Sequence, residues 1–494
     1  MLTELQNHLA KIADLQGAIA LLDWEQQTYM PTGGAEARAN QLSTLSEIAH
    51  RMKTDPRIGD WLSALEAQAD QWAYDSDIAS LLRVTRHNYD RATKVPAELT
   101  AEITRVTTLS QQAWVSARKA NDYAAFKPHL AQVIALTRQY AACFSTTAPI
   151  YDSLLADYER DTTAADIQNM FDSIKHDLID LVQDIAKRNR PEDRAILERG
   201  YGVAGQRKLS RLVSEKIGYD YQRGRSDEVA HPFCTTFSIN DVRITTRYLK
   251  NWLSSGLFGT LHESGHALYE QGSAQNLERT PLAGGTSLGI HESQSRLWEN
   301  IVGRSKAFWL WAYPFTQKTF PRQLGDVSLD QFYRAINYVQ PSLIRVEADE
   351  VTYNLHIMVR FELEQALLND QISLDDLPTA WNDKYTHYLG ITPPNDRDCV
   401  LQDVHWSVGY LAYFPTYSIG NLLSAQFYAQ AEQDLPGLSD DFVQGKFDRL
   451  LNWLQTHIYA HGSKFTPKEI VQRVTGGGMS AQPYLDYLKG KYSG

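Results

Sequence analysis

The sequence predicts a mainly α-helical protein that contains one small β-hairpin, and three observations support this fold class. Apolar residues recur at intervals of three and four along most of the 494 residues, which is the spacing of one helix face. Only residues 233–246 depart from this pattern, with a concentration of β-branched and aromatic residues. The chain contains no internal repeat, low-complexity tract or long linker, so we expect residues 1–494 to form a single unit.

The first helix and a later one illustrate the pattern. Near the start, Leu2, Leu5, Leu9 and Ile12 fall on one helical face. Further along, Thr163 is placed to cap the first turn of a helix. The core-facing residues predicted for that helix are Ile167, Phe171, Ile174, Leu178, Leu181 and Ile185.

The predicted hairpin pairs residues 233–239 with residues 242–246, and Asn240-Asp241 forms the turn. It precedes the histidine motif described below. An exposed edge strand beside a metal can bind an extended peptide through backbone hydrogen bonds. A small structural sheet that only supports the wall of a cleft explains the same pattern, and the sequence leaves both interpretations open.

Composition and charge indicate an ordinary folded protein. Hydrophobic residues make up 43% of the chain and charged residues 22%. The net charge is -11 and no basic patch stands out, so we expect no nucleic-acid partner. No apolar run approaches the roughly 20 residues of a membrane span, and residues 1–23 lack the pattern of a signal peptide. We therefore expect no membrane association and a cytoplasmic location.

The three cysteines are Cys143, Cys234 and Cys399, an odd number spread widely along the chain. This distribution argues against a disulfide framework and against a cysteine metal cluster. We expect reduced thiols.

The segment around residue 262 has the pattern HExxH. His262 and His266 are four residues apart, so on a helix both imidazoles project from one face and can hold one metal ion. Glu263 can take a proton from the water that the metal activates and deliver it to the leaving amine. The alternative is a chance pair of histidines, but the helix is apolar around the motif, and burying these groups without partners is costly.

A hydrolytic zinc site needs a third protein ligand and an open position for water. Glu292 is the best candidate, because a glycine-containing turn over residues 281–289 allows the chain to return in a helix that carries it. His291 is the rival ligand, and a solvated Glu292 without a metal role is the other alternative.

Several separated motifs resemble those of the thermostable carboxypeptidase Taq family of metallocarboxypeptidases. The resemblance extends from about residue 20 to about residue 485. One position departs from it, because Cys399 stands where the last motif, GxxQDxHW, begins with glycine. The matching segments are Asp23-Trp24-Glu25, Tyr29-Met30-Pro31, Gly33 to Arg38, His231-Pro232-Phe233, Asp241 to Thr245, His262 to His266, His291 to Gln294, Ile344-Arg345 with Ala348-Asp349, and Gln402-Asp403 with His405-Trp406.

The resemblance implies a large helical metallopeptidase fold with a deep substrate cleft, shared with neurolysin-like peptidases. Residues 1–200 would form a helical wall of the cleft, and residues 201–494 the metal-binding and substrate-binding part. The implied enzyme is a homodimer that removes single C-terminal residues from peptides with broad specificity. Its one divalent ion would be zinc, with cobalt as the alternative, held by His262, His266 and Glu292, with Glu263 as general base.

A carboxypeptidase must bind a free C-terminal carboxylate, which the planar fork of an arginine can do with two hydrogen bonds. Arg345 is our candidate. We expect it to begin a long helix after Pro341, on which Arg345, Asp349, Thr352 and His356 form a polar stripe that lines a wet cleft. The alternative is a solvent-facing stripe with an ordinary ion pair between Arg345 and Asp349.

Other polar residues of the matching region are candidates for contact with the substrate. His405 and Tyr417 are suited to donate hydrogen bonds to the oxyanion that forms during hydrolysis, although either is equally suited to a packed core. Gln402, Arg243 and His231 are further substrate-site candidates, which sequence spacing does not place.

Two other functions fit the same motifs. An endopeptidase or dipeptidyl carboxypeptidase on the same fold would keep the metal site and shift the substrate register. An inactive metal-binding or peptide-binding module would keep the ligands and release no amino acids, although the presence of Glu263 argues against it.

Overall fold

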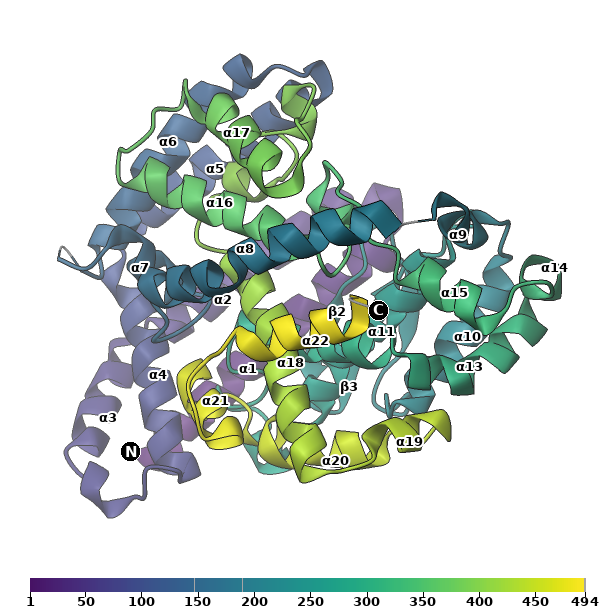
Figure 1. Cartoon of the computed structure of the whole chain (residues 1–494). Helices are drawn as coiled ribbons and strands as arrows, with labels where there is room; N and C mark the ends of the chain where they lie inside the picture. The colour runs from purple at the N-terminus through teal and green to yellow at the C-terminus, as the bar shows by residue number, and fades with distance from the viewer. Residues whose placement is uncertain (146, 189, 493–494) are drawn as a thin grey trace. The chain divides into compact units, whose positions relative to one another are not determined.

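The computed structural model describes residues 1–145, 147–188 and 190–492, and it confirms a mainly helical fold with one small sheet (Figure 1). The described residues group into two compact units, each assembled from separate stretches of chain. Unit 1 comprises Met1–Ala92, Arg190–Asn337 and Phe427–Gly478. Unit 2 comprises Thr93–Asn189, Tyr338–Gln426 and Met479–Gly494. The division of the chain into a wall and a site-bearing part near residue 200 stays a prediction.

The α-helices follow one another along the chain, and the two longest connections between them are residues 217–252, which contain the β-sheet, and residues 390–414. They are α1 (Leu2–Thr28), α2 (Ala35–Lys53), α3 (Pro56–Glu66), α4 (Asp77–Lys94), α5 (Ala97–Ala120), α6 (Tyr123–Ala142), α7 (Ile150–Leu155), α8 (Ala164–Arg188), α9 (Pro191–Ala195), α10 (Val203–Lys216), α11 (Leu253–Gln271), α12 (Leu288–Arg296), α13 (Lys306–Thr319), α14 (Pro321–Leu324), α15 (Leu329–Ile336), α16 (Tyr353–Leu368), α17 (Leu377–Leu389), α18 (Pro415–Asp434), α19 (Leu438–Val443), α20 (Asp448–His457), α21 (Pro467–Thr475) and α22 (Gln482–Tyr492).

Short 3₁₀ turns and one π-helical segment complete the helical structure. The π-helical segment is η5 (Leu297–Val302), which continues α12. The 3₁₀ turns are η1 (Thr32–Gly34), η2 (Ala69–Gln71), η3 (Ile196–Glu198), η4 (Gln275–Leu277), η6 (Arg345–Glu347), η7 (Asp396–Asp398), η8 (His405–Val408) and η9 (Tyr459–His461). None of the described helices is both long enough and apolar enough to cross a bilayer.

The predicted apolar faces are buried, except that Leu2 at the start of α1 is only partly buried. In α1, Leu5, Leu9 and Ile12 pack with leucines and isoleucines of α3 and α4 in a core of unit 1. In α8, Thr163 caps the first turn, because its hydroxyl accepts from the Asp166 amide while its own amide donates to the Asp166 carboxylate. All the core-facing residues predicted for α8 are buried.

The predicted hairpin is present, and the structure adds a third strand. β2 (Cys234–Ser238) pairs antiparallel with β3 (Asp241–Thr246), and the turn lies one residue earlier than predicted, at Ile239-Asn240. β1 (Ser226–Glu228) pairs parallel with the other edge of β3. Its Ser-Asp-Glu sequence is polar and short, so neither composition nor alternation indicated a strand.

The helix α11 is the central support of the candidate site. It packs against β2 and β3 and also against α12 and η5. Its residues from Leu253 to Gln271 are mostly buried, as expected for a helix that is covered on several sides.

The segment before α16 differs from the prediction. Arg345 lies in the short turn η6, and the long helix begins only at Tyr353, so the predicted helix starting after Pro341 is wrong. The Asp349 carboxylate explains the start, because it accepts hydrogen bonds from the amides of Val351 and Thr352 at the beginning of the helix. The predicted wet stripe is wrong as well, since Arg345, Thr352 and His356 are buried.

Candidate metal centre

Three predicted ligands converge in unit 1. One ligand atom each of His262, His266 and Glu292 lies within 4.8 Å of the other two. The two histidines project from α11 one turn apart, with ring centroids separated by 4.9 Å. Glu292 comes from α12, and its Oε2 lies 3.5 Å from Nε2 of His262 and 3.4 Å from Nε2 of His266. His291, the rival ligand, is outside this group.

A close approach of α11 and α12 brings these side chains together. Gly265, inside the HExxH motif, allows it: a Cβ built there would lie 2.6 Å from the carbonyl oxygen of Gln294 and from Cα of Ser295. Any larger residue at position 265 would push the two helices apart. The glycine therefore sets the separation that lets a carboxylate from α12 reach the two imidazoles.

The separation of the Glu292 oxygen from each imidazole nitrogen fits a tetrahedral ion. Zinc bonds to nitrogen and oxygen of about 2.0–2.2 Å place tetrahedral ligand atoms about 3.3–3.6 Å apart. The two measured nitrogen–oxygen separations, 3.5 and 3.4 Å, fall in this range. Two imidazoles and one carboxylate also form the donor set of hydrolytic zinc sites with an open fourth position. The residues therefore fit a divalent metal.

Glu299 of η5 orients the first histidine and was missed in the sequence. Its Oε2 lies 2.9 Å from Nδ1 of His262, which leaves Nε2 facing the candidate metal position. Arg296 and Arg304 lie within ion-pair distance of the same carboxylate. Although burial opposes ionisation, His262 and Arg296 lower the pKa of Glu299 to about 2. Glu299 lies seven residues, or two helical turns, after Glu292, and this helical spacing could have identified it in the sequence.

Two neighbouring side chains, Arg296 and Ser295, hold the Glu292 carboxylate in place. Arg296 donates from Nε to Oε1 at 2.7 Å, and the Ser295 hydroxyl donates to Oε2 at 3.0 Å. Burial favours the neutral acid, but Arg296 and His262 hold the pKa of the Glu292 carboxyl well below its usual range. It is therefore a carboxylate at neutral pH.

The neighbouring titratable groups are strongly shifted. Burial raises the pKa of Glu263, which is 6% exposed, to about 7. Burial lowers the pKa of His266 to about 4, whereas at His262 the carboxylates of Glu292 and Glu299 outweigh burial and raise the pKa to about 9. Opposed shifts among neighbours are typical of catalytic sites.

The predicted carboxylate-binding arginine lies in unit 2, in a buried cluster. Arg345 donates from Nε and Nη2 to Oδ1 of Asp403 at 3.0 and 2.9 Å, and from Nη1 to the Tyr353 hydroxyl at 2.6 Å. Gln402 accepts from the Arg345 amide and donates to the Leu343 carbonyl, so it holds the backbone that carries Arg345.

Asp403 is a second residue that the sequence reasoning did not single out. It also accepts from Nε of Arg360 at 2.7 Å. Burial opposes its ionisation, but the two guanidinium groups hold its pKa well below the usual range. Arg345, Asp403 and Arg360 together therefore form a buried cluster with one excess positive charge. The signal was present, since Asp403 follows Gln402 directly within a matching motif.

His405 and Tyr417 lie together in the same unit, with Nε2 of His405 3.4 Å from the Tyr417 hydroxyl. Burial lowers the pKa of His405 to about 4, so the ring is neutral at physiological pH. The guanidinium of Arg345 lies 5.0 Å from the Tyr417 ring centroid. The structure thus groups Arg345, Gln402, His405 and Tyr417.

The remaining candidates lie beside the sheet of unit 1. Arg243 of β3 forms two hydrogen bonds of 2.8 Å with Asp241, and its guanidinium lies 4.4 Å from the Trp24 ring centroid. His231 is exposed in the bend that precedes β2. In unit 2, Cys399, which replaces the motif glycine, is buried and has a φ of -117°, outside the left-handed region that favours glycine.

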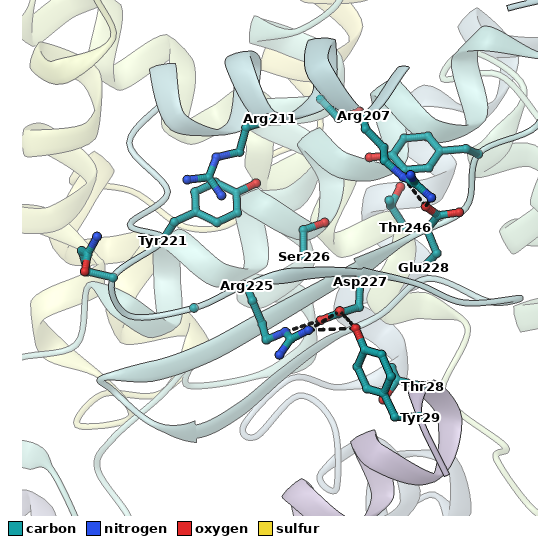
Figure 2. Close-up of a pocket in the computed structure, with 14 residues that line it drawn as sticks. Thr28, Tyr29, Arg207, Arg211, Tyr221, Arg225, Ser226, Asp227, Glu228 and Thr246 are labelled. Atoms are coloured by element: carbon teal, nitrogen blue, oxygen red, sulfur yellow. Dashed lines mark hydrogen bonds and ion pairs between the residues drawn. The ribbon is translucent and has the colours of Figure 1, made fainter. Parts of the chain in front are cut away.

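A separate cavity of about 770 Å³ lies beside β1 and contains none of the predicted site residues (Figure 2). Its charged groups are paired: Arg225 binds Asp227 with Tyr29, and Arg207 binds Glu228. The metal-ligand group lies outside this cavity, and the case for it rests on its donor chemistry.

Comparisons with known proteins agree with this geometry. Residues 4–492 match the model of the carboxypeptidase Taq (M32) metallopeptidase family. The chain is 44% identical to thermostable carboxypeptidase 1 of Thermus thermophilus, over 100% of this chain and 98% of that protein. It is 36% identical to carboxypeptidase 1 of Bacillus subtilis, over 98% and 96% of the two chains.

Solved structures show the same fold. The crystal structure of an M32 carboxypeptidase from Deinococcus radiodurans superposes with a TM-score of 0.97 at 42% identity, covering 99% of this chain and 98% of that one. The chain therefore belongs to the carboxypeptidase Taq (M32) family of metallopeptidases and is a metallocarboxypeptidase.

Proposed function

We propose that the enzyme releases single amino acids from the C-terminus of peptides at a metal held by His262, His266 and Glu292. The observation that carries the proposal is the convergence of two imidazole nitrogens on one carboxylate oxygen, at 3.5 and 3.4 Å. A divalent ion bound there supplies a Lewis acid that polarises the scissile carbonyl and acidifies water. Zinc is our first choice and cobalt the second, because this donor set suits several divalent ions.

Glu263 is the proposed general base and acid. It follows His262 directly on α11, and it is not part of the ligand group. Burial raises its pKa to about 7, which suits a group that takes a proton from the attacking water and returns it to the leaving amine at neutral pH.

Arg345 is the proposed partner of the substrate's terminal carboxylate. Two of its five N–H groups have no acceptor among the described residues, and these suit a carboxylate. The excess positive charge of the Arg345, Asp403 and Arg360 cluster also favours an incoming anion. Gln402 contributes by fixing the backbone of Arg345.

His405 and Tyr417 are the proposed hydrogen-bond donors to the oxyanion. A neutral His405 ring carries one N–H, and the Tyr417 hydroxyl carries the second donor. For Arg243 and His231 we propose a role beside the substrate, because Arg243 lies on β3 and His231 precedes β2, and these two paired strands pack on α11. In this proposal β2 also offers its edge to an extended peptide.

Several finer properties belong to the same proposal. We infer broad specificity and a homodimer from the motifs that the chain shares with its family. A cytoplasmic location agrees with the free thiols of Cys143, Cys234 and Cys399. Residues 1–494 would work as one catalytic unit, with residues 1–200 forming a cleft wall and residues 201–494 the metal and substrate part.

A peptide-ladder assay tests the function. The purified enzyme would be incubated with a peptide that has a free C-terminus and with the same peptide amidated, each with and without a chelator. We expect single residues to leave the free peptide only, and the chelator to stop the reaction. Cleavage of the amidated peptide would indicate an endopeptidase, release of dipeptides a dipeptidyl carboxypeptidase, and no cleavage of either a binding module.

A further inference from the structure

His291 and Glu270 lie behind the second metal ligand in an arrangement that the proposed function does not use. Nδ1 of His266 lies 2.6 Å from Nδ1 of His291, and Nε2 of His291 lies 2.7 Å from Oε1 of Glu270. The three side chains therefore form a continuous hydrogen-bonded chain that leads away from the ligand group.

With both imidazole rings neutral, the carboxylate at the end of this chain allows only one arrangement of protons. A carboxylate only accepts hydrogen bonds, so Nε2 of His291 must carry the proton. A neutral His291 then has a bare Nδ1, which accepts the proton of His266 Nδ1. The single proton of a neutral His266 thus sits on Nδ1, and the lone pair of its Nε2 points toward Glu292, 3.4 Å away. In the reverse arrangement, Nδ1 of His291 would donate to Nδ1 of His266. The proton of His266 would then sit on its metal-facing Nε2, and the bare Nε2 of His291 would face the carboxylate of Glu270, lone pair against lone pair.

The glycine loop between the two ligand helices is shaped around this chain. A Cβ built at Gly285 would lie 2.5 Å from Cδ2 of His291. A Cβ built at Gly284, whose φ is +90°, would lie 3.0 Å from Oε2 of Glu270. The Gly285 amide also donates to Oε1 of Glu270 at 3.1 Å. The loop therefore provides space for both side chains and satisfies the buried carboxylate.

We propose that His291 and Glu270 are positioning residues that hold His266 in its metal-binding tautomer and ring orientation, and so set the affinity of the site for its metal. This inference rests on the proposed ligand set. In this proposal the adjacent residues His291 and Glu292 have different roles. Glu292 binds the metal, and His291 supports the ligand His266. Loss of such supporting hydrogen bonds weakens metal binding by about 10- to 100-fold.

Metal affinity, measured on the full chain, tests the proposal. Apoprotein would be titrated with Zn²⁺ against a chromophoric chelator. His291→Phe keeps a ring and removes the acceptor, and we expect affinity to fall by about 10- to 100-fold. His291→Asn restores an acceptor oxygen near the position of Nδ1, and we expect it to recover most of the loss. His50→Phe, at an exposed histidine of α2, is the matched control and should bind as wild type does.

The Co²⁺ absorption spectrum gives a readout that a purely structural role would not move. We expect His291→Phe to change the d–d bands and His291→Asn to restore them. Wild-type affinity and an unchanged spectrum in folded His291→Phe would overturn the proposal. Should that variant fail to fold, Glu270→Gln, which has nearly the same shape, replaces it: a loss of about tenfold supports the role and no loss overturns it.

The ligand set itself is tested separately. His266→Ala should abolish tight Zn²⁺ binding if the proposed ligands are correct. If His266→Ala binds as tightly as wild type, the ligand set is wrong. If His266→Ala loses binding while His291→Phe and Glu270→Gln keep it, the ligand set stands and the positioning role fails.

Discussion

Glu263 stands out among the buried carboxylates of α11 because its pKa is raised to about 7 by burial. Glu292 of α12 and Glu299 of η5 are instead held as carboxylates by Arg296 and the histidines. The three acids thus divide into one that can exchange a proton near neutral pH and two that stay charged. This division is what a general base beside a charged ligand set requires.

Glu263→Gln tests the role of the base. The variant keeps the size of the side chain and cannot take a proton, so we expect kcat to fall by at least about 100-fold while bound metal stays equimolar. Kinetics with a free peptide and metal analysis of the purified protein are the measurements. Glu47→Gln, at an exposed position of α2, is the control. Near-normal turnover in Glu263→Gln would show that another group moves the proton.

Arg345→Ala tests recognition of the substrate's end. The variant removes a charged donor pair, worth roughly 1.5–3 kcal/mol, so we expect the preference for a free over an amidated C-terminus to fall by about 10- to 100-fold. Arg345→Lys keeps the charge without the planar fork, so we expect its preference to lie between those of wild type and Arg345→Ala. The ratio of kcat/KM for the two peptides is the measurement. An unchanged ratio in Arg345→Ala would remove this residue from carboxylate recognition.

At the scale of elements, the meeting of α11 and α12 decides the metal centre. Gly265 lies where the two helices touch, whereas Gly259, six residues earlier on α11, has only the Thr246 hydroxyl oxygen nearby, at 3.8 Å. Replacing each glycine by alanine therefore distinguishes the effect of helix propensity, which is common to both positions, from the effect of the contact between α11 and α12, which exists only at Gly265.

Gly265→Ala should destabilise the fold and weaken metal binding together. The added Cβ would overlap the backbone of α12, and such overpacking typically costs about 1–3 kcal/mol. Gly259→Ala is the matched control, and we expect it to be neutral or stabilising by up to about 1 kcal/mol because alanine favours helix. Thermal unfolding and Zn²⁺ titration of both variants are the measurements. Equal behaviour of the two alanine variants would contradict the close approach of α11 and α12.

A buried carboxyl group, that of Glu364, lies where α7, α16 and η8 meet in unit 2, and it predicts that stability depends on pH. Glu364 of α16 accepts hydrogen bonds from Tyr151, Trp406 and the Ala412 amide, yet burial raises its pKa to about 7. The folded-state pKa exceeds the unfolded value near 4.5. The stabilisation is therefore fully present below pH 4.5 and is lost as the pH rises through 7.

Comparison with Glu364→Gln isolates this contribution. A pKa difference of about 2.5 corresponds to roughly 3 kcal/mol. We therefore expect the stability of wild type relative to Glu364→Gln to decrease by an amount of that order between pH 4.5 and 7.5. Denaturation midpoints of both proteins across this range provide the measurement. A relative stability that stays constant or increases with pH would show that Glu364 is already ionised in the folded state.

At the scale of the whole molecule, the two units carry different chemistry. The metal-ligand group lies in unit 1, and the Arg345, Gln402, His405 and Tyr417 group lies in unit 2. The proposed substrate-binding groups of unit 2 come from chain segments more than fifty residues after Glu292. The proposed metal chemistry therefore belongs to unit 1, and the proposed carboxylate recognition belongs to unit 2.

Metal binding should stabilise the folded molecule through unit 1. A ligand at about 100 times its Kd adds about 2.7 kcal/mol to the free energy of unfolding, so we expect Zn²⁺ to raise the unfolding temperature of the apoprotein. Glu292→Gln removes a charged ligand and should reduce this rise strongly. Differential scanning calorimetry of both proteins, with and without Zn²⁺, is the measurement. An equal rise in the two proteins would place the stabilising ion elsewhere.

The sequence by itself determined the helical fold class, the hairpin, the faces of α1 and α8, and the pairing of His262 with His266. Each of these depends on spacing within one element, and the periods of helix and strand convert spacing directly into direction. The order of motifs also sufficed to recognise the family.

Only the tertiary structure placed Glu292, and not His291, in one group with His262 and His266, and only it revealed Glu299, Glu270 and Asp403 as partners of the predicted residues. It also moved the start of α16 to Tyr353 and buried Arg345 against Asp403. Adjacent residues such as His291 and Glu292 point in different directions from the same helix. Which of them reaches a histidine depends on where the neighbouring helix stands, and that position is set by packing at contacts such as Gly265, which no local spacing encodes.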